Sequence, residues 1–146
     1  MDRFLTNGDT FRVTTNKACC GLVFGFPQNN FKCCFVPKPL KEKYGNRYMA
    51  WFIVLDGTWN DDDKGRRFRN FISDDGETIK LEFDGNQNAL DPNYDLALKQ
   101  NDLLVFRKLK THYTFVGVFN ETKILRDNNG DYKGKLFARK AETIKL

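Results

Sequence analysis

Histidine and cysteine, the side chains that most often bind zinc, are few in this sequence. It contains a single histidine, His112, and four cysteines in two doublets, Cys19-Cys20 and Cys33-Cys34. The doublets lack the C-x-x-C spacing of zinc sites, and the histidine lies far from both. We expect both doublets to lie in strands, where adjacent thiols point to opposite faces. The cysteines are therefore interpreted as small buried hydrophobic residues in a reducing cytosol, without a metal.

Long apolar segments are also missing. No run approaches the length of a membrane-spanning helix, and no apolar leader opens the chain. We therefore expect a cytoplasmic protein that has no membrane partner. The sequence also lacks the G-x-S-x-G motif of hydrolases and the glycine-rich loops that bind phosphates or dinucleotides. Its motifs give no support for catalysis or for a cofactor.

The composition is that of a globular β-rich domain. The chain has 146 residues, of which 40% are hydrophobic and 14% aromatic, and these include fourteen phenylalanines and five tyrosines. Aromatic residues favour strands, and this length is typical of one domain, so we assign residues 1–146 to a single domain. The net charge of +5 is a weak indication of an acidic partner such as nucleic acid.

Alternating apolar and polar residues predict about nine short strands and at most two short helical turns. Residues 48–55 are apolar almost throughout, as in a strand that is buried on both faces. A central β-hairpin is predicted from two apolar runs, residues 103–108 and 113–119, which flank a short basic link. We expect an all-β fold with one or two short helices, as an open β-barrel, a pseudobarrel or two packed sheets. The other segments with strand or helix patterns are 9–15, 19–24, 31–36, 66–73, 77–83, 124–126 and 132–140 (strands), and 40–44 and 95–99 (helical turns).

The sharpest charge feature is a group of four cations within six residues, beside an aromatic residue and an amide. Alternation places Arg67, Arg69 and Phe71 on one strand face. Arginine can fork onto guanine edges or phosphates, which indicates nucleic-acid binding. Alternatively, the aspartates at 61–63 neutralise these cations across a solvated loop. The group and its neighbours are Lys64, Arg66, Arg67, Arg69, Trp59 and Asn60.

Further basic and amide-rich segments could add contacts. Amides at 24–32 and 84–94 could read base edges, while lysines at 32 and 38 and at the hairpin tip could neutralise phosphates. The alternative is that these are ordinary surface loops. The basic C-terminal strand around Lys133 and Lys135 could also contribute, although a solvated edge strand with protective lysines would look the same.

A metal-dependent nuclease is a second hypothesis. Asp102, Glu121 and Lys123 have the outline of a D…E-x-K signature. If the 103–119 hairpin forms, its open end brings Asp102 near Glu121, where two carboxylates could hold Mg²⁺ and Lys123 could orient water.

Residues 100–107, Q-N-D-L-L-V-F-R, follow the "G/N-D-x-x-x-F" entry to a late strand. In this the chain resembles the B3-like pseudobarrels that serve as DNA-recognition modules, including those of restriction endonucleases. The segments at 24–32 and at 84–94 or 57–69 resemble the two arms with which that family grips the major groove. The resemblance implies recognition of duplex DNA, with cleavage or translocation supplied by a nuclease or ATPase domain on the same or another chain.

The sequence thus predicts a non-catalytic, sequence-specific DNA-recognition module, such as the specificity domain of a restriction system. RNA binding, the small Mg²⁺ nuclease and a protein-interaction domain remain open as alternatives. The predicted DNA-binding residues are Asn29, Asn30, Lys32, Lys38, Trp59, Asn60, Lys64, Arg66, Arg67, Arg69, Asn86, Gln87, Lys108 and Lys110.

Overall fold

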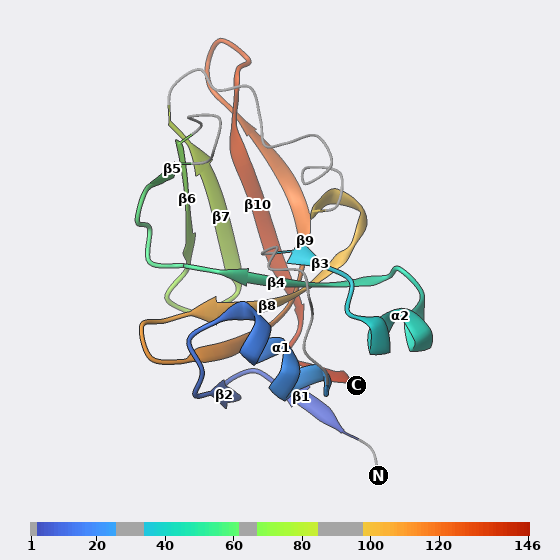
Figure 1. Cartoon of the computed structure of the whole chain (residues 1–146). Helices are drawn as coiled ribbons and strands as arrows, with labels where there is room; N and C mark the ends of the chain where they lie inside the picture. The colour runs from blue at the N-terminus through green and yellow to red at the C-terminus, as the bar shows by residue number, and fades with distance from the viewer. Residues whose placement is uncertain (1–2, 26–33, 62–66, 85–97) are drawn as a thin grey trace.

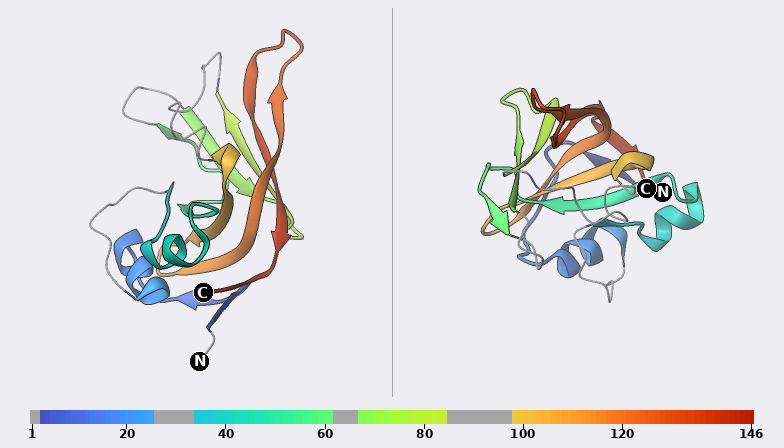
Figure 2. Two further views of the ribbon diagram at one scale, coloured as in Figure 1. Left: turned by 90° about the vertical axis from the view of Figure 1, so that its right-hand side faces the viewer. Right: turned by 90° about the horizontal axis from the view of Figure 1, so that it is seen from above.

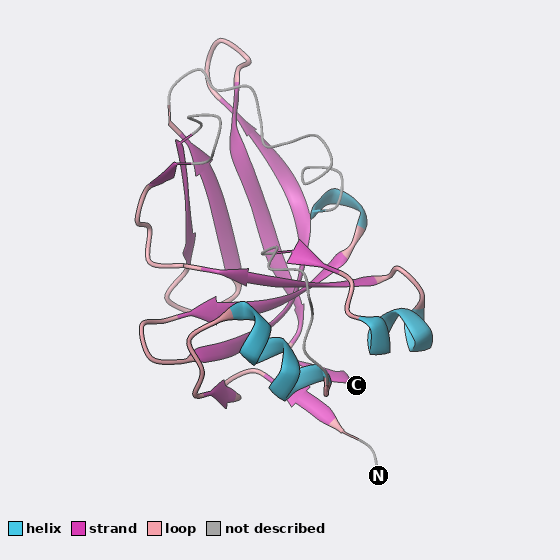
Figure 3. Cartoon of the chain, viewed as in Figure 1, coloured by secondary structure: helices cyan, strands magenta, loops and turns pink. Residues whose placement is uncertain are grey.

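The computed structural model describes residues 3–25, 34–61, 67–84 and 98–146, and most of them lie in strands (Figures 1 and 3). Two helices pack beside the strands, and a further helical turn covers residues 98–100. The prediction of an all-β domain with short helices is confirmed. The described elements are β1 (Phe4–Thr6), β2 (Thr10–Phe11), α1 (Asn16–Phe24), β3 (Cys34–Phe35), α2 (Lys38–Tyr44), β4 (Tyr48–Ile53), β5 (Asn60–Asp61), β6 (Arg67–Ile72), β7 (Thr78–Phe83), β8 (Asp102–Lys108), β9 (Tyr113–Arg126), β10 (Tyr132–Ala141) and β11 (Thr143–Lys145).

Nine of these strands form one sheet in the order β3-β4-β8-β9-β10-β7-β6-β5, with β2 also paired to β9. Within the described residues its two outer strands, β3 and β5, do not meet, so the sheet does not close into a barrel. A separate ribbon of β1 and β11 holds the two ends of the chain on the same side of the molecule (Figure 2).

Strand β9 joins the two halves of the sheet. Its first half pairs with β8 and its second half pairs with β10, and the strand curves along its length (Figure 2). Gly117 lies close to the change of partner, with a φ of 127° and a register shift against β8 between it and Phe115. A Cβ atom at this position would lie 2.7 Å from Cδ of Arg139. Glycine therefore permits both the backbone angle and the passage of the Arg139 side chain.

Strand β4 is buried on both faces, as its sequence predicts. Ala50 and Phe52 belong to one hydrophobic core, whereas Trp51 and Ile53 belong to the other. Strand β8 alternates between the same two cores and runs parallel to β4. The core that contains Ala50 and Phe52, which we call the lower core, is covered by α1. The core that contains Trp51 and Ile53, the upper core, is covered by β7 and β10. Strands β4 and β8 therefore form the middle layer of the molecule.

The predicted strand at residues 19–24 is wrong, because these residues form α1. The hydroxyl of Thr15 accepts a hydrogen bond from the Ala18 amide, and Gly25 ends the helix with a φ of 86°. In a helix, successive side chains are about 100° apart rather than opposed. Both Cys19 and Cys20 therefore reach the lower core and are buried, contrary to the expectation of thiols on opposite faces.

The remaining predicted segments are largely confirmed. Within the described residues, the segments predicted at 66–73 and 77–83 contain β6 and β7, which form a hairpin. The segments at 103–108 and 113–119 form the β8–β9 hairpin, and residues 40–44 lie in α2. Two strand predictions differ from the structure: the strand at 9–15 shortens to β2, and residues 124–126 continue β9 instead of forming a separate strand. Among the described helices, none combines the length and apolar character that crossing a membrane requires.

Candidate nucleic-acid interface

The outer face of β6 carries a cluster of arginines and aromatic rings. The guanidinium of Arg69 lies 4.4 Å from the ring centroid of Trp59 and 5.5 Å from that of Phe71. Arg67 lies 5.3 Å from the Trp59 ring. The prediction that Arg67, Arg69 and Phe71 share one strand face is confirmed, because alternate residues of β6 point the same way. We call Trp59, Arg67, Arg69 and Phe71 the tryptophan–arginine cluster.

The link between β4 and β5 places Trp59 over these arginines. Asp56 forms an isolated bridge with Phe71, which ties the link to β6. A carboxylate oxygen of Asp56 accepts a hydrogen bond of 2.9 Å from the Thr58 amide. The Asn60 side chain donates to the carbonyl of Thr58 over 3.0 Å. The tryptophan is thus positioned by a short, hydrogen-bonded turn.

The acidic partners of the cluster lie on β7 and just after it. Arg67 forms an ion pair of 3.6 Å with the exposed Asp84, and Arg69 forms one of 3.1 Å with the half-buried Glu82. Asp61 lies opposite Arg67 in the β5–β6 ladder, whereas positions 62 and 63 lie outside the described residues. Acidic residues of β7 and its end therefore take part in neutralising the cluster. An exposed pair such as Arg67–Asp84 stabilises a protein by only about 0–1 kcal/mol, so this guanidinium can exchange its partner for a phosphate.

The tip of the β8–β9 hairpin is basic and adjoins the β4–β5 link. Lys108 and Lys110 are exposed there, while His112 is half-buried and lies 3.0 Å from the Thr111 hydroxyl. A pocket of about 290 Å³ separates the tip from the link, and Asp56 lines it together with residues 107–110. Strands β5 and β6, the β4–β5 link and the tip of the β8–β9 hairpin lie along the left of Figure 1. They carry the tryptophan–arginine cluster and the lining of the pocket, and we refer to them together as one edge.

Arg107 is a potential binding residue that the sequence analysis missed. It lines this pocket, and its buried Nε has no hydrogen-bond partner in the described part of the chain. Hydrogen bonds from the hydroxyl and amide of Thr58, with a smaller effect of the Arg107 charge, lower the pKa of Asp56. The basic run Arg107-Lys108 was visible in the sequence, but an arginine within an apolar strand gave no signal of facing a pocket.

The structure brings six of the predicted DNA-binding residues to this edge. Four lie at or beside the tryptophan–arginine cluster, namely Trp59, Asn60, Arg67 and Arg69, and two, Lys108 and Lys110, lie at the hairpin tip. Lys38 belongs to α2, which both views place on the opposite side of the molecule from β5 and β6 (Figures 1 and 2). The other predicted residues lie outside the described part of the chain: Asn29, Asn30, Lys32, Lys64, Arg66, Asn86 and Gln87.

The two carboxylates of the nuclease hypothesis have separate basic partners. Asp102 accepts hydrogen bonds from Lys140 over 3.0 Å and from Arg47 over 3.4 Å. Glu121 forms an ion pair with the buried Lys135. The described residues include no group of three or more metal-ligating side chains. The geometry therefore gives a Mg²⁺ site no support in this part of the chain.

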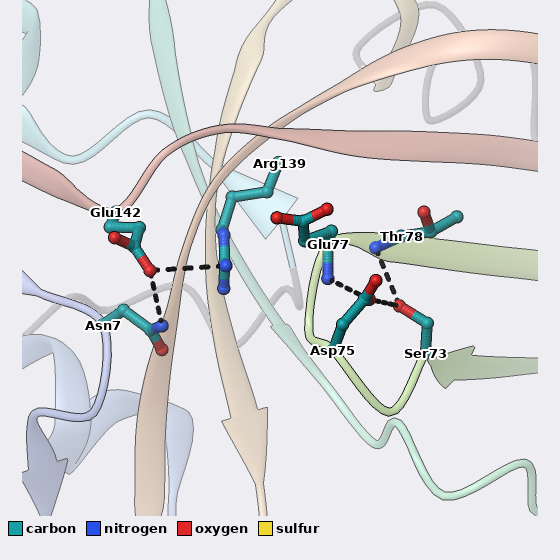
Figure 4. Close-up of polar contacts among 7 residues, drawn as sticks. All are labelled: Asn7, Ser73, Asp75, Glu77, Thr78, Arg139 and Glu142. Carbon is teal, nitrogen blue, oxygen red and sulfur yellow. Dashed lines mark hydrogen bonds and ion pairs between the residues drawn. The ribbon is translucent and has the colours of Figure 1, made fainter.

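The interpretation of the basic C-terminal segment as a solvated edge strand is wrong. Strand β10 lies between β9 and β7, and Lys135 points into the interior. Farther along β10, Arg139 pairs with Glu142 over 3.3 Å, and Glu142 also accepts a hydrogen bond from Asn7 (Figure 4). Alternation in a sequence shows which residues share a face, but it does not show where a strand lies in the sheet.

The β6–β7 turn in the same close-up is held by its own side chains. The hydroxyl of Ser73 donates to Asp75 over 2.6 Å and accepts from the Thr78 amide over 3.0 Å (Figure 4). Hydrogen bonds from Ser73 and from the Glu77 amide lower the pKa of Asp75. This turn stabilises the hairpin that carries the tryptophan–arginine cluster.

The cluster, the pocket and the hairpin tip together make up the candidate interface. A comparison with protein-family models gives no match, and a comparison with curated proteins gives none either.

Proposed function

We propose that this chain is a non-catalytic module that binds duplex DNA through the tryptophan–arginine cluster and the tip of the β8–β9 hairpin. The observation that carries the proposal is the placement of Arg67 and Arg69 against Trp59 on an accessible sheet face. Stacking on an indole ring reduces the freedom of a guanidinium, and the edge of Arg69 that donates to Glu82 in this structure could donate to a phosphate or a base instead. Such a pre-oriented fork suits guanine edges and backbone phosphates.

The hairpin tip supplies a second group of contacts. Lys108 and Lys110 are exposed and lie on the same edge as the cluster. Lysines in such positions neutralise phosphates and fix the orientation of a protein on the duplex, while arginines near the bases select the sequence. Contacts from both the cluster and the hairpin tip would hold the arginines in a fixed position against one stretch of DNA.

The finer parts of the proposal rest on the sequence. From the resemblance of residues 100–107 we propose a B3-like, sequence-specific module of a restriction system. Cleavage or translocation would then belong to a nuclease or ATPase domain on the same or another chain. A module of this type would act in the cytoplasm.

The test compares two arginine variants by fluorescence anisotropy with a labelled duplex. Arg47→Ala is the matched control, since Arg47 is also exposed, pairs with an acid (Asp102) and lies 5.0 Å from a ring, that of Tyr48. The double variant Arg67→Ala/Arg69→Ala should weaken binding at least tenfold, because each good arginine–base contact contributes about 1–3 kcal/mol. Arg47→Ala should bind like the unmodified protein.

The same assay separates the alternatives. Equal affinities for both variants would show that the cluster is not the interface. Absence of binding to duplex DNA would contradict the proposal, and preferential binding of RNA would replace it. Thermal unfolding of each variant confirms that a loss of binding is not a loss of folding.

A further inference from the structure

We propose that the pocket between the β4–β5 link and the β8–β9 hairpin binds a phosphoryl group, with Arg107 as its buried donor. The inference rests on the proposed function in one respect, since the DNA backbone would be a natural source of that group. The same chemistry is offered by free phosphate. The pocket is therefore testable apart from DNA binding.

The charge of the pocket favours an anion. Arg107, Lys108 and Lys110 line it, against the single carboxylate of Asp56. That carboxylate is already engaged by the amide of Thr58, so it offsets only part of the positive charge. These cations come from one hairpin and give the surroundings of the pocket a net positive charge, which favours an oxyanion there.

The hydrogen bonding of Arg107 indicates which chemical group the pocket would bind. Its Nε is buried, and none of the described residues accepts a hydrogen bond from it. Leaving a buried donor without a hydrogen bond destabilises the folded state, and more so when the group is charged. An oxyanion in the pocket would accept this hydrogen bond and gain the directional geometry that arginine offers to phosphates.

The fold holds Arg107 in place before any ligand arrives. The residue lies in the middle layer, where its backbone pairs with Ile53 of β4 on one side and Thr114 of β9 on the other. The pocket of about 290 Å³ is several times the roughly 30 Å³ that one water molecule occupies in the liquid. It therefore has room for a phosphoryl group and part of an attached sugar.

The first experiment follows the Nε–Hε resonance of Arg107 by NMR while inorganic phosphate replaces chloride at constant ionic strength. A saturable shift of this resonance, together with amide shifts at 107–110, is the expected result. Arg107→Gln should abolish the saturation, and Lys110→Ala should weaken phosphate binding severalfold. Lys41→Ala on α2, another exposed lysine, should leave phosphate affinity unchanged.

Two results would overturn the proposal. One is the absence of a saturable shift in the unmodified protein. The other is unchanged phosphate binding in Arg107→Gln or, if that variant does not fold, unchanged phosphate binding in Lys110→Ala. Because Lys110 is exposed, its variant provides a reading even if Arg107→Gln does not fold.

A second experiment distinguishes the source of the phosphoryl group and the two proposals. Inorganic phosphate should displace labelled duplex at constant ionic strength if the pocket holds a backbone phosphate. Phosphate binding without any duplex binding would support the pocket and contradict the DNA-binding function. Duplex binding that neither phosphate nor Arg107→Gln alters would support the function and contradict the pocket as a DNA contact, leaving the NMR titration to decide on free phosphate.

Discussion

Lys135 and Glu121 form an ion pair that is almost completely removed from solvent. Their side chains are 1% and 8% exposed, and they face each other across β10 and β9. Charges in such a position require each other, because the free energy of desolvation is offset only while the pair is intact. The pair links the neighbouring strands β9 and β10 and favours their observed register.

Removing one partner should therefore be far more damaging than replacing both. Lys135→Met should lower the free energy of unfolding by about 3–5 kcal/mol, because Glu121 is left buried without its cation. The double variant Lys135→Met/Glu121→Leu should recover most of that loss. Urea unfolding of the two single variants and the double variant measures the coupling, and additive effects would show that the residues do not depend on each other.

The thiols of the first doublet are buried and weakly acidic. Burial, with a smaller contribution from the neighbouring Cys20, raises the pKa of Cys19 to about 12, and burial raises the pKa of Cys20 to about 11. An unfolded thiol ionises near its ordinary pKa of 9.0. Above that pH the unfolded state releases protons that the folded state keeps.

Stability should consequently decline as the pH rises from about 9 toward 11. Urea unfolding at pH 8 and pH 10 measures this decline, and a Cys19→Ala/Cys20→Ala variant should show a smaller one. Native protein at pH 8 should also protect both thiols from iodoacetamide, as judged by peptide mass spectrometry. Labelling at the rate of the unfolded chain would contradict their burial.

At the scale of elements, the close approach of β10 to β7 depends on Gly134. Its φ is 151°, and a Cβ atom there would overlap the carbonyl oxygen of Leu81 in the neighbouring strand. No small shift of a side chain relieves such an overlap, because the obstacle is backbone. Strand pairing at this point therefore requires glycine.

Gly134→Ala should lower the free energy of unfolding by several kcal/mol or prevent folding, since β7 and β10 must separate. Gly130→Ala is the matched control, because Gly130 has a φ of 82° with open space around it. It should cost only about 1 kcal/mol. Thermal unfolding of both proteins provides the comparison, and similar melting temperatures would show that the strands do not need glycine here.

Local patterns predicted the elements whose neighbours lie close in the sequence. The β6–β7 and β8–β9 hairpins were evident from strand patterns around short polar links, and β4 from its continuous apolar run. Helix α1 was missed because a short apolar run fits a strand or a helix, although Thr15 and Gly25 were available as capping signals. The parallel pairing of β4 with β8 could not be predicted, since it depends on the tertiary fold.

The candidate site was predicted in part for the same reason. Arg67 and Arg69 share a face by strand alternation alone, so their association was readable from the sequence. The proximity of the hairpin tip to the β4–β5 link required the fold, as did the burial of Arg107. The burial of Lys135 could not be predicted either, because a lysine in an alternating strand usually indicates a face that is exposed to solvent.

Over the whole molecule, ion pairs that hold the fold and cations that are open to a ligand lie in different places. The Lys135–Glu121 pair lies inside the upper half, and Asp102 binds Arg47 and Lys140 at the far end of β8. The tryptophan–arginine cluster lies on the outer face of β6, and the basic hairpin tip adjoins the β4–β5 link. The Arg67–Asp84 pair and the two lysines of the tip are exposed, which leaves these cations available to a polyanion.

The salt dependence of duplex binding tests this account most directly. About four cations, Arg67, Arg69, Lys108 and Lys110, are available at the edge, so log Kobs should fall with log salt at a slope of about −3 to −4. The variant Arg69→Ala/Lys110→Ala should reduce the magnitude of that slope by about 2, at roughly 0.9 for each lost contact. Binding that is absent or independent of salt, or a slope unchanged in this variant, would contradict the assignment of this edge as a DNA interface.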